Sequence, residues 1–272
     1  PAALQGLVGF KSTARRVPIA GALPLATTLD TVSAVALSVR DAVVLHEVLA
    51  SRRVPLLQPR LSEQRFAVPR RLMLDGLDDT VGRAFRRSLS VLAAAGARID
   101  EIELAPLAEL ASIQATASFA AAESWAFHRR WLAEHEAEYD PRVARRIRRG
   151  ETMSAADYID LVAARRDWIA RMEIALQDFD AVLSPTVPMV APPLAPLVDD
   201  DAFFAVNNLL LRNPSCVNFL DGCALSLPCQ GDDELPVGLM VWHGAEHDDA
   251  VLAAGLAIET ELAGAAIGRP HA

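Results

Sequence analysis

The amino-acid sequence predicts an α/β fold in which a mixed β-sheet is flanked by helices. The clearest observation is the stretch "DGLDDTVGRAFRRSLSVLAAAGARIDEIEL", which predicts an amphipathic helix over 78–95 and, after Gly96, a strand over 98–104. The preceding "RFAVPRR" reads as a short strand. Strand, helix and strand in this order are typical of a βαβ unit in a parallel or mixed sheet.

The other elements expected before residue 180 follow from apolar periodicity and from helix-start residues. An apolar run over 6–10 suits a buried strand, and the segment up to Asp30, whose carboxylate we expect to satisfy backbone N–H groups of a turn, is loop-rich. Ser38 begins the next helix. Long helices are expected over 107–135 and 154–178, and their apolar faces are assigned to Phe127, Trp131, Trp168, Ile169, Met172 and Ile174.

The last third of the chain predicts more of the sheet. "DAVLSP" is a buried strand that leads into a Pro-rich loop, and two further strands are expected over 224–227 and 237–242. A closing helix follows, with Asp248 as a predicted N-cap.

Length and composition indicate one folded domain over 1–272. The chain has 272 residues, of which 52% are hydrophobic and 22% are charged, so that a large buried core is expected. The formal net charge of −9 makes nucleic acid and anionic membranes poor partners. No charge-free apolar stretch of about 18 residues occurs, and a membrane span is therefore not expected.

The three cysteines, Cys216, Cys223 and Cys229, include no C-x-x-C pair and cannot all form disulfides with one another. We interpret them as reduced residues of a cytoplasmic protein. The local pattern "HGAEH", residues 243–247, fits H-x-x-E-H, a zinc-binding motif when it lies on one helix. Because an expected strand runs into His243 and Gly244 interrupts the next turn, we favour a polar loop over a metal site.

Two regions together resemble the amidase signature family of serine hydrolases. The first contains Pro1-Ala2, "GLVGFKST", Arg16-Val17, Pro24-Leu25 and "TLD" before a helix. The second contains "SPTVP", "NFLDGCALSLP", "LPVGLMVW" and the final helix. Four positions depart from the family pattern: Ser12 and Cys223 stand where many members have Pro, and Ser33-Ala34 replaces a common Gly-Pro.

The resemblance implies an amide hydrolase that releases ammonia or an amine from a small carboxamide through an acyl-enzyme. In the family a Lys, a Ser with a cis peptide and a nucleophilic Ser carry the reaction. All three are expected upstream of Pro1, and Lys11 matches a different family position. The resemblance therefore implies no catalytic residue within this chain, which would be inactive alone as the C-terminal part of one catalytic domain. It also implies no cofactor, no metal and a homodimer.

The resemblance further assigns pocket walls to the chain. These candidates lie on an expected helix, in the P-T-x-P loop and around "NFLDGC"; they are Trp125, Phe127, Pro185, Thr186, Arg212, Asn213, Asn218, Phe219, Asp221 and Cys223. An equally open interpretation is that residues such as Asn218 and Asp221 only cap and turn a buried strand.

Two alternatives to the hydrolase remain open from the sequence. An amidotransferase A-type subunit belongs to the same family, and such subunits carry an acidic residue shortly before the Asn that corresponds to Asn218. The run "NNLLLRNPSCVN" contains no acid, which disfavours that function. The other alternative is a catalytically inactive fragment or scaffold with a binding role.

Overall fold

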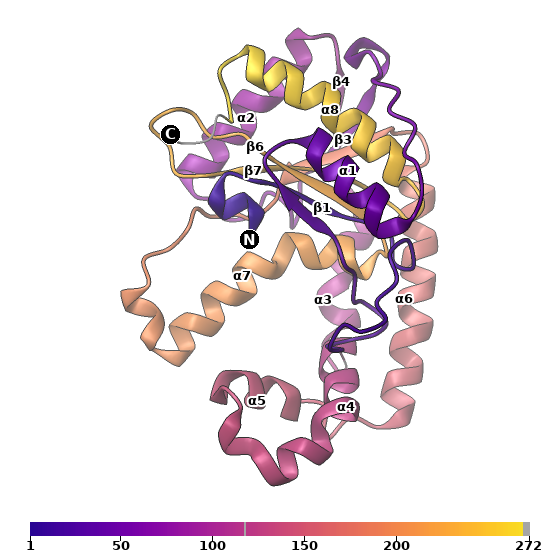
Figure 1. Cartoon of the computed structure of the whole chain (residues 1–272), viewed down its shortest axis with the longest axis vertical. Coiled ribbons are helices and arrows are strands. Elements are labelled where there is room, and N and C mark those ends of the chain that lie inside the picture. The colour runs from indigo at the N-terminus through magenta and orange to yellow at the C-terminus, as the bar shows by residue number, and fades with distance from the viewer. Residues whose placement is uncertain (117, 269–272) are drawn as a thin grey trace.

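The computed structural model describes residues 1–116 and 118–268 and places a seven-stranded sheet at the centre of this part of the chain (Figure 1). The strand order is β2-β1-β6-β7-β5-β3-β4. The strands are β1 (Val8–Lys11), β2 (Ala34–Ala36), β3 (Arg65–Pro69), β4 (Arg98–Ile102), β5 (Ala181–Pro185), β6 (Cys223–Pro228) and β7 (Gly238–His243).

The sheet is mixed, as the sequence predicts. β3 runs parallel to both β4 and β5, whereas β1, β2, β6 and β7 are joined through antiparallel pairs and β7 also pairs antiparallel with β5. The helix between β3 and β4 completes the predicted βαβ unit. Asp78 caps that helix by accepting a hydrogen bond from the backbone N–H of Val81, and Gly96 adopts a φ of 95° in the turn that leads to β4.

Helices account for most of the remaining described residues. The α-helices are α1 (Val39–Ala50), α2 (Asp79–Ala94), α3 (Leu110–Ile113), α4 (Phe119–His135), α5 (Pro141–Arg148), α6 (Ala155–Leu176), α7 (Asp200–Phe219) and α8 (Asp248–Gly264). Short 3₁₀ helices are η1 (Ala2–Gln5), η2 (Leu61–Glu63), η3 (Ala105–Glu109), η4 (Glu136–Glu138) and η5 (Ala195–Val198). No helix of the described residues is both long and apolar enough to cross a membrane.

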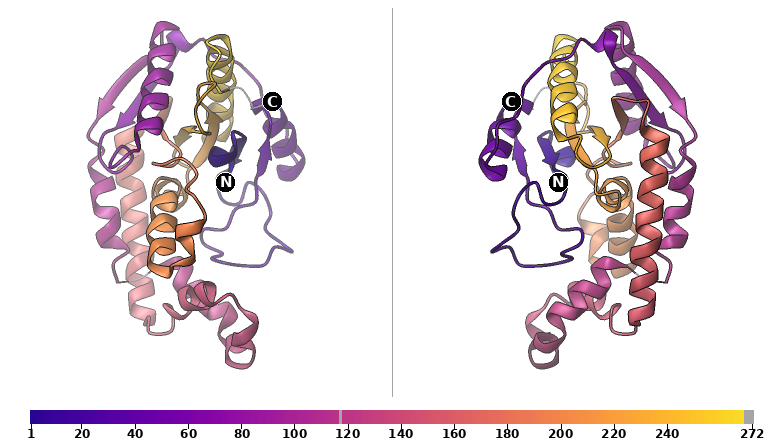
Figure 2. Two further views of the ribbon diagram at one scale, coloured as in Figure 1. Left: turned by 90° about the vertical axis from the view of Figure 1, so that its left-hand side faces the viewer. Right: turned by 90° about the vertical axis from the view of Figure 1, so that its right-hand side faces the viewer.

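The two faces of the sheet are covered by different helices, which gives three layers (Figures 1 and 2). One core contains buried side chains of α1, α2 and α8 together with alternate residues of the central strands. The other core contains buried side chains of α6, α7 and the start of α4, around Trp168 and Trp242. Because successive side chains of a strand point to opposite faces of the sheet, each central strand contributes alternate residues to the two cores.

Beyond these layers, α4 and α5 project away from the sheet at the lower end of Figure 1. Their contact has a small core of its own, formed by Leu132, Ala144 and Ile147 with Trp125 and Tyr139 packed against it. The start of α4 is thus held by the large core, whereas α5 and the rest of α4 depend on a separate and smaller set of apolar contacts.

Three expectations about local structure are wrong. The helix expected over 107–135 is interrupted, because η3 and α3 end by Ile113 and α4 starts anew with Ser118 as its N-cap. Phe127, Trp131 and Ile174 are not core residues, since 45%, 61% and 66% of their surfaces are exposed.

Further along the chain, Asp248 is not an N-cap. Its side chain is fully buried, and its carboxylate binds Thr13. Strand β2 was not expected from the sequence, since its three residues are too few for a clear alternation.

Candidate functional site

The end of β5 and helix α7 meet at Asn213, which is completely buried. Its Nδ2 donates hydrogen bonds to the carbonyl oxygens of Met73 (3.0 Å) and Pro185 (2.8 Å). Its Oδ1 accepts a hydrogen bond from Nε of Arg212 (3.1 Å). Asn213 therefore uses both amide donors within the fold and holds α7 against the strand that precedes the Pro-rich loop.

Arg212, the neighbour of Asn213, has one guanidinium nitrogen without a hydrogen-bond partner among the described residues. This nitrogen, Nη2, is buried. Burial lowers the pKa of Arg212, and attraction to Asp75 opposes this effect. A buried cationic donor without a partner is costly, so Arg212 is suited to accept a polar or anionic group.

Thr186 lies where β5 and β6 end and β7 begins. Its backbone N–H donates to the carbonyl of Gly238 (2.8 Å), and its Oγ1 shares a hydrogen bond with Oγ of Ser226 (2.7 Å). A Cβ at Gly238 would lie within 2.7 Å of both hydroxyl oxygens, so only glycine permits this approach. Pro185, Thr186, Arg212 and Asn213 thus lie close together in the structure.

A second group forms at the turn between α7 and β6. Asp221 has a φ of 60°, and its carboxylate accepts a hydrogen bond from the backbone N–H of Ala14 (3.2 Å). Nζ of Lys11 donates to the carbonyl oxygen of Gly222 (2.6 Å). Cys223 is fully buried, and burial raises the pKa of its thiol, which therefore stays protonated. These contacts join the end of β1 to the start of β6.

Lys11 and Thr13 link this turn to helix α8. Burial lowers the pKa of Lys11 to about 8, although attraction to Asp221 acts in the opposite direction. Thr13 donates to the buried carboxylate of Asp248 from its backbone N–H (2.8 Å) and from its hydroxyl (2.7 Å). Arg16 also faces Asp248, with its Nε 3.5 Å from the carboxylate. This network was not expected from the sequence, because its members come from opposite ends of the chain.

The aromatic candidates occupy different places. Phe219 is buried, with its ring centroid 5.4 Å from that of Trp168, and its carbonyl accepts a hydrogen bond from Arg165. Trp125 packs in the small core between α4 and α5, and Phe127 lies on the exposed side of α4. Trp125 and Phe127 thus sit apart from the residues at the end of β5. Asn218 is partly buried and makes no side-chain hydrogen bond within the described part of the chain.

The H-x-x-E-H pattern does not form a metal centre. His243 ends β7, where its Nδ1 accepts a hydrogen bond from the backbone N–H of Gly244 and its Nε2 donates to the carbonyl of Phe179. Both ring nitrogens are therefore occupied. His247 stacks on His243 with centroids 3.7 Å apart, and burial together with this neighbour lowers the pKa of His243 to about 4. Across residues 1–116 and 118–268, no cluster of three or more His, Cys, Asp or Glu could hold a metal ion.

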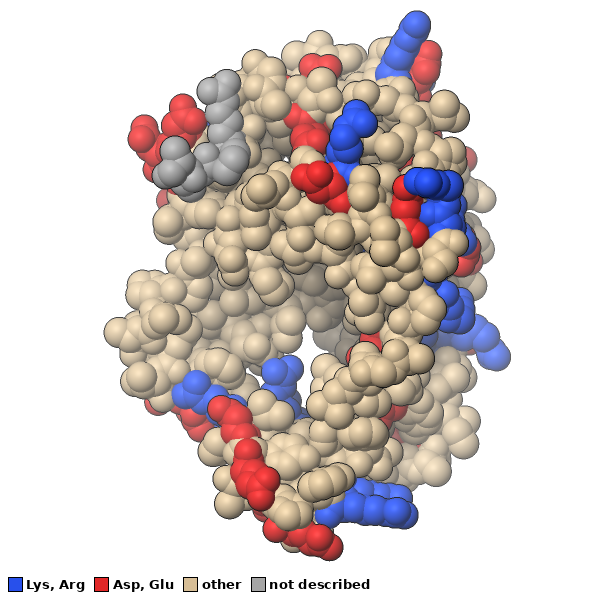
Figure 3. Space-filling view, viewed as in Figure 1, with Lys and Arg blue, Asp and Glu red and all other residues tan. Residues whose placement is uncertain are grey.

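The middle of the face in Figure 3 is mostly uncharged, whereas charged residues gather above it, at its right-hand side and at its lower edge. This face is hollowed between α7 and the α4–α5 end. Large apolar side chains are exposed along the segment from residue 23 to residue 48; they are Leu23, Leu25, Val35, Leu37, Val44, Leu45 and Val48. A folded chain in water rarely exposes so many apolar side chains in one region unless another surface covers them.

Comparison with known proteins places this fold and these motifs in one family. The family model described as Amidase matches residues 1–252, which is most of the chain. The chain therefore belongs to the amidase family.

Individual relatives agree with this assignment. A 2-amino-5-chloromuconic acid deaminase from Comamonas testosteroni is 29% identical over 100% of this chain and 59% of its own length. The A-type subunit of a glutamyl-tRNA(Gln) amidotransferase from Clostridium botulinum is 29% identical over 89% of the chain and 56% of its own length. An indoleacetamide hydrolase from Agrobacterium vitis is 29% identical over 96% of the chain and 60% of its own length.

Among solved structures, one described as an amidase superposes with a TM-score of 0.83 and 32% identity, over 96% of this chain and 59% of its own. The chain thus spans about three fifths of the length of these relatives.

Proposed function

We propose that the protein is an amide hydrolase of the amidase family that acts on a small carboxamide. The observation that carries this proposal is the family match over residues 1–252, with hydrolytic enzymes among the relatives that align along nearly the whole chain. In the proposed reaction a serine attacks the carboxamide carbonyl, ammonia or an amine leaves, and water cleaves the acyl-enzyme. The family resemblance assigns the serine, a second serine with a cis peptide and a lysine to a segment before residue 1. No metal or cofactor enters this reaction.

Residues 1–272 would then be part of a single amidase domain and would supply walls of its substrate pocket. The arrangement at the end of β5 supports this role, because Asn213 fixes Arg212 beside Pro185 and Nη2 of Arg212 has no hydrogen-bond partner among the described residues. Thr186, Asn218, Phe219, Asp221 and Cys223 are proposed for the same wall. Trp125 and Phe127 lie apart on α4 and would belong to a different part of the pocket. For Asp221 and Cys223 a purely structural role is equally consistent with their contacts.

The exposed apolar residues of β2 and α1 support the same domain organisation. Val35 lies in β2, which pairs only with β1 among the described strands, and Val44 and Val48 are exposed on α1. We propose that the remainder of the amidase domain packs on this surface. Covering these side chains would contribute about 25 cal/mol for each Å² of apolar surface removed from water.

Within the family, helix α7 favours a hydrolase over an amidotransferase component. The family resemblance places an acidic residue shortly before the position of Asn218 in amidotransferase A-type subunits. Between Asp201 and Asn218 this helix contains no Asp or Glu. The helix therefore lacks a carboxylate that would hold the amino group of glutamine at that position.

The decisive experiment uses the full-length gene product. We expect it to release ammonia or amine from members of a panel of aliphatic and aryl carboxamides, and to be labelled on one serine by a fluorophosphonate probe. An Arg212→Leu variant should raise KM at least several-fold, whereas Arg130→Leu, on an exposed part of α4, should leave KM unchanged. A folded protein that is neither labelled nor active on any amide would contradict the proposal and favour a scaffold.

The proposed setting is a cytoplasmic enzyme that forms a homodimer and binds neither nucleic acid nor membranes. The net charge of −9 supports the lack of nucleic-acid binding. Light scattering of the full-length protein should give twice the mass of one chain, and a monomer at micromolar concentration would refute the dimer.

A further inference from the structure

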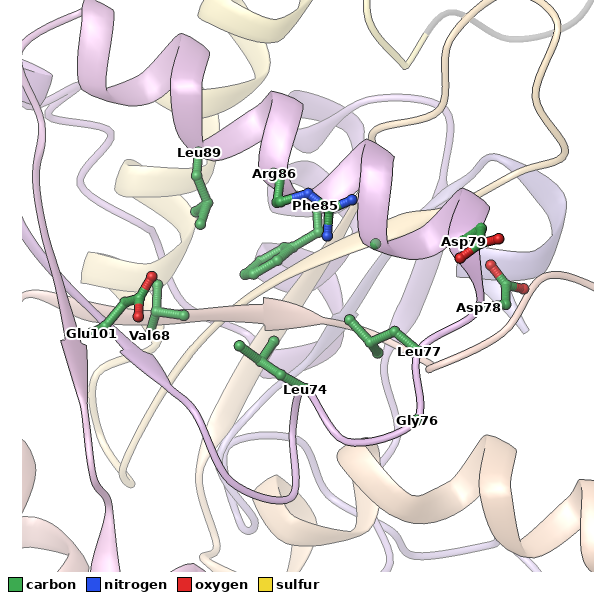
Figure 4. A pocket seen from close by; sticks show the side chains of 11 residues that line it. Val68, Leu74, Gly76, Leu77, Asp78, Asp79, Phe85, Arg86, Leu89 and Glu101 are labelled. Atoms are coloured by element: carbon green, nitrogen blue, oxygen red, sulfur yellow. The ribbon is translucent and has the colours of Figure 1, made fainter.

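A groove lies between helix α2 and the sheet, away from the residues gathered at the end of β5. Its volume is about 430 Å³, within the range of small-molecule sites. Phe85 and Leu89 from α2 face Val68 of β3 and Leu74 of the following loop across this space (Figure 4). Leu77 closes the same side. The floor of the groove is therefore apolar and comes from three different segments of the chain.

Arg86 stands over this apolar floor. Its guanidinium makes no hydrogen bond or ion pair among the described residues, although it lines the groove. Gly82, one helical turn earlier, explains its position. A Cβ at Gly82 would lie 3.3 Å from Nη1 of Arg86, so the guanidinium occupies the space that a larger residue would restrict. A glycine inside a helix costs about 1 kcal/mol relative to alanine, and here it leaves room for Arg86 to lie along the groove.

Arg86 is exposed at the groove, and no carboxylate of the described residues forms an ion pair with it. The carboxylate of Asp78 accepts two backbone N–H groups and is committed to capping α2 and holding the loop after β5. Glu101 forms an ion pair with Arg70 at 2.9 Å. Asp79 is exposed near Asp78 at the N-terminal end of α2 (Figure 4). Arg86 is thus the cation that can pair with a bound anion inside the groove.

We propose that this groove binds a small amphipathic monocarboxylate, with an apolar body against Phe85 and Leu74 and the carboxylate on Arg86. A guanidinium pairs with a carboxylate through two parallel hydrogen bonds, which fixes the ligand's direction. The apolar floor provides burial for a chain or ring of roughly six to ten carbon atoms. This site is independent of the proposed hydrolase function, since none of its residues belongs to the proposed pocket wall.

The test titrates the full chain, labelled with ¹³C in its Leu and Val methyl groups, with 4-phenylbutyrate and with the uncharged 4-phenylbutan-1-ol. We expect saturable shifts of the Leu74, Leu77 and Leu89 methyl signals with the acid and binding about tenfold weaker for the alcohol. Arg86→Gln should weaken acid binding about tenfold. The control Arg83→Gln, on the same helix but outside the groove, should not change it.

A second variant separates the position of Arg86 from its charge. Gly82→Ala retains the arginine but requires the tip of its flexible side chain to move by a few tenths of an ångström, so acid binding should weaken less than in Arg86→Gln while the circular dichroism of the helices is preserved. Three results would overturn the proposal. They are no saturable shift of the groove methyls, equal affinity for the acid and the alcohol, or unchanged acid affinity in Arg86→Gln.

Discussion

Replacing Lys11 with methionine should change how the stability of the protein depends on pH. Nζ of Lys11 is held against the carbonyl of Gly222, and burial lowers its pKa from 10.5 to about 8. The unfolded chain therefore holds this proton more tightly than the folded chain does. Stability increases with pH wherever the unfolded state binds more protons.

The size of this effect follows from the shift of the Lys11 pKa. A fall from 10.5 to about 8 corresponds to roughly 3 kcal/mol, at 1.36 kcal/mol for each pKa unit. Below pH 8 the lysine is charged in both states, and folding carries this full cost of burying the charge. Between pH 8 and 10.5 Lys11 is increasingly neutral in the folded chain but still protonated in the unfolded chain. The free-energy cost of burying its charge therefore falls progressively as the pH rises.

The assay is urea unfolding of the wild type and of Lys11→Met at pH 7, 8, 9 and 10, followed by tryptophan fluorescence. The difference in unfolding free energy, wild type minus variant, should increase by about 2 kcal/mol or more over this range. Arg15→Met serves as a control, because Arg15 is exposed. The difference in unfolding free energy between the wild type and this variant should not change with pH. A flat profile for Lys11→Met would show that burial does not lower this pKa.

Two further substitutions test the contacts around the α7–β6 turn, each by urea unfolding at pH 7. Asp248→Ala leaves the buried N–H and hydroxyl of Thr13 without an acceptor and should cost about 3–5 kcal/mol; a cost below about 1 kcal/mol would contradict this role. Gly222→Ala should cost about 3 kcal/mol, because its Cβ would overlap with the carbonyl of His243. Gly264→Ala, where no other described residue lies within 4 Å, should be neutral or stabilising, and equal effects of the two glycine variants would refute the steric argument.

The elements that the sequence predicted well are those with local signals at both ends. Helix α2 begins with the Asp78 cap and ends near Gly96, and both signals act within a few residues of the backbone groups that they satisfy. The aromatic residues of α4 show that local sequence signals do not predict burial. Phe127 and Trp131 suggest a buried helical face, yet they are exposed because α4 projects beyond the sheet. Burial there depends on what lies beside the helix, and local periodicity does not contain that information.

At the candidate site, local sequence signals likewise fail to predict contacts between residues that are far apart in the sequence. Motif positions pointed to Asn213 and its neighbours, which lie close together, and their part in a pocket stays a prediction. Thr13 and Asp248, in contrast, are 235 residues apart, and an Asp at the start of a helix resembles an ordinary cap. Their contact exists only because the fold brings the end of β1 next to the start of α8. Lys11 likewise binds a backbone carbonyl rather than another motif side chain. These motif residues therefore hold the ends of strands in place, and we expect their substitution to displace the proposed pocket walls without removing a reacting group.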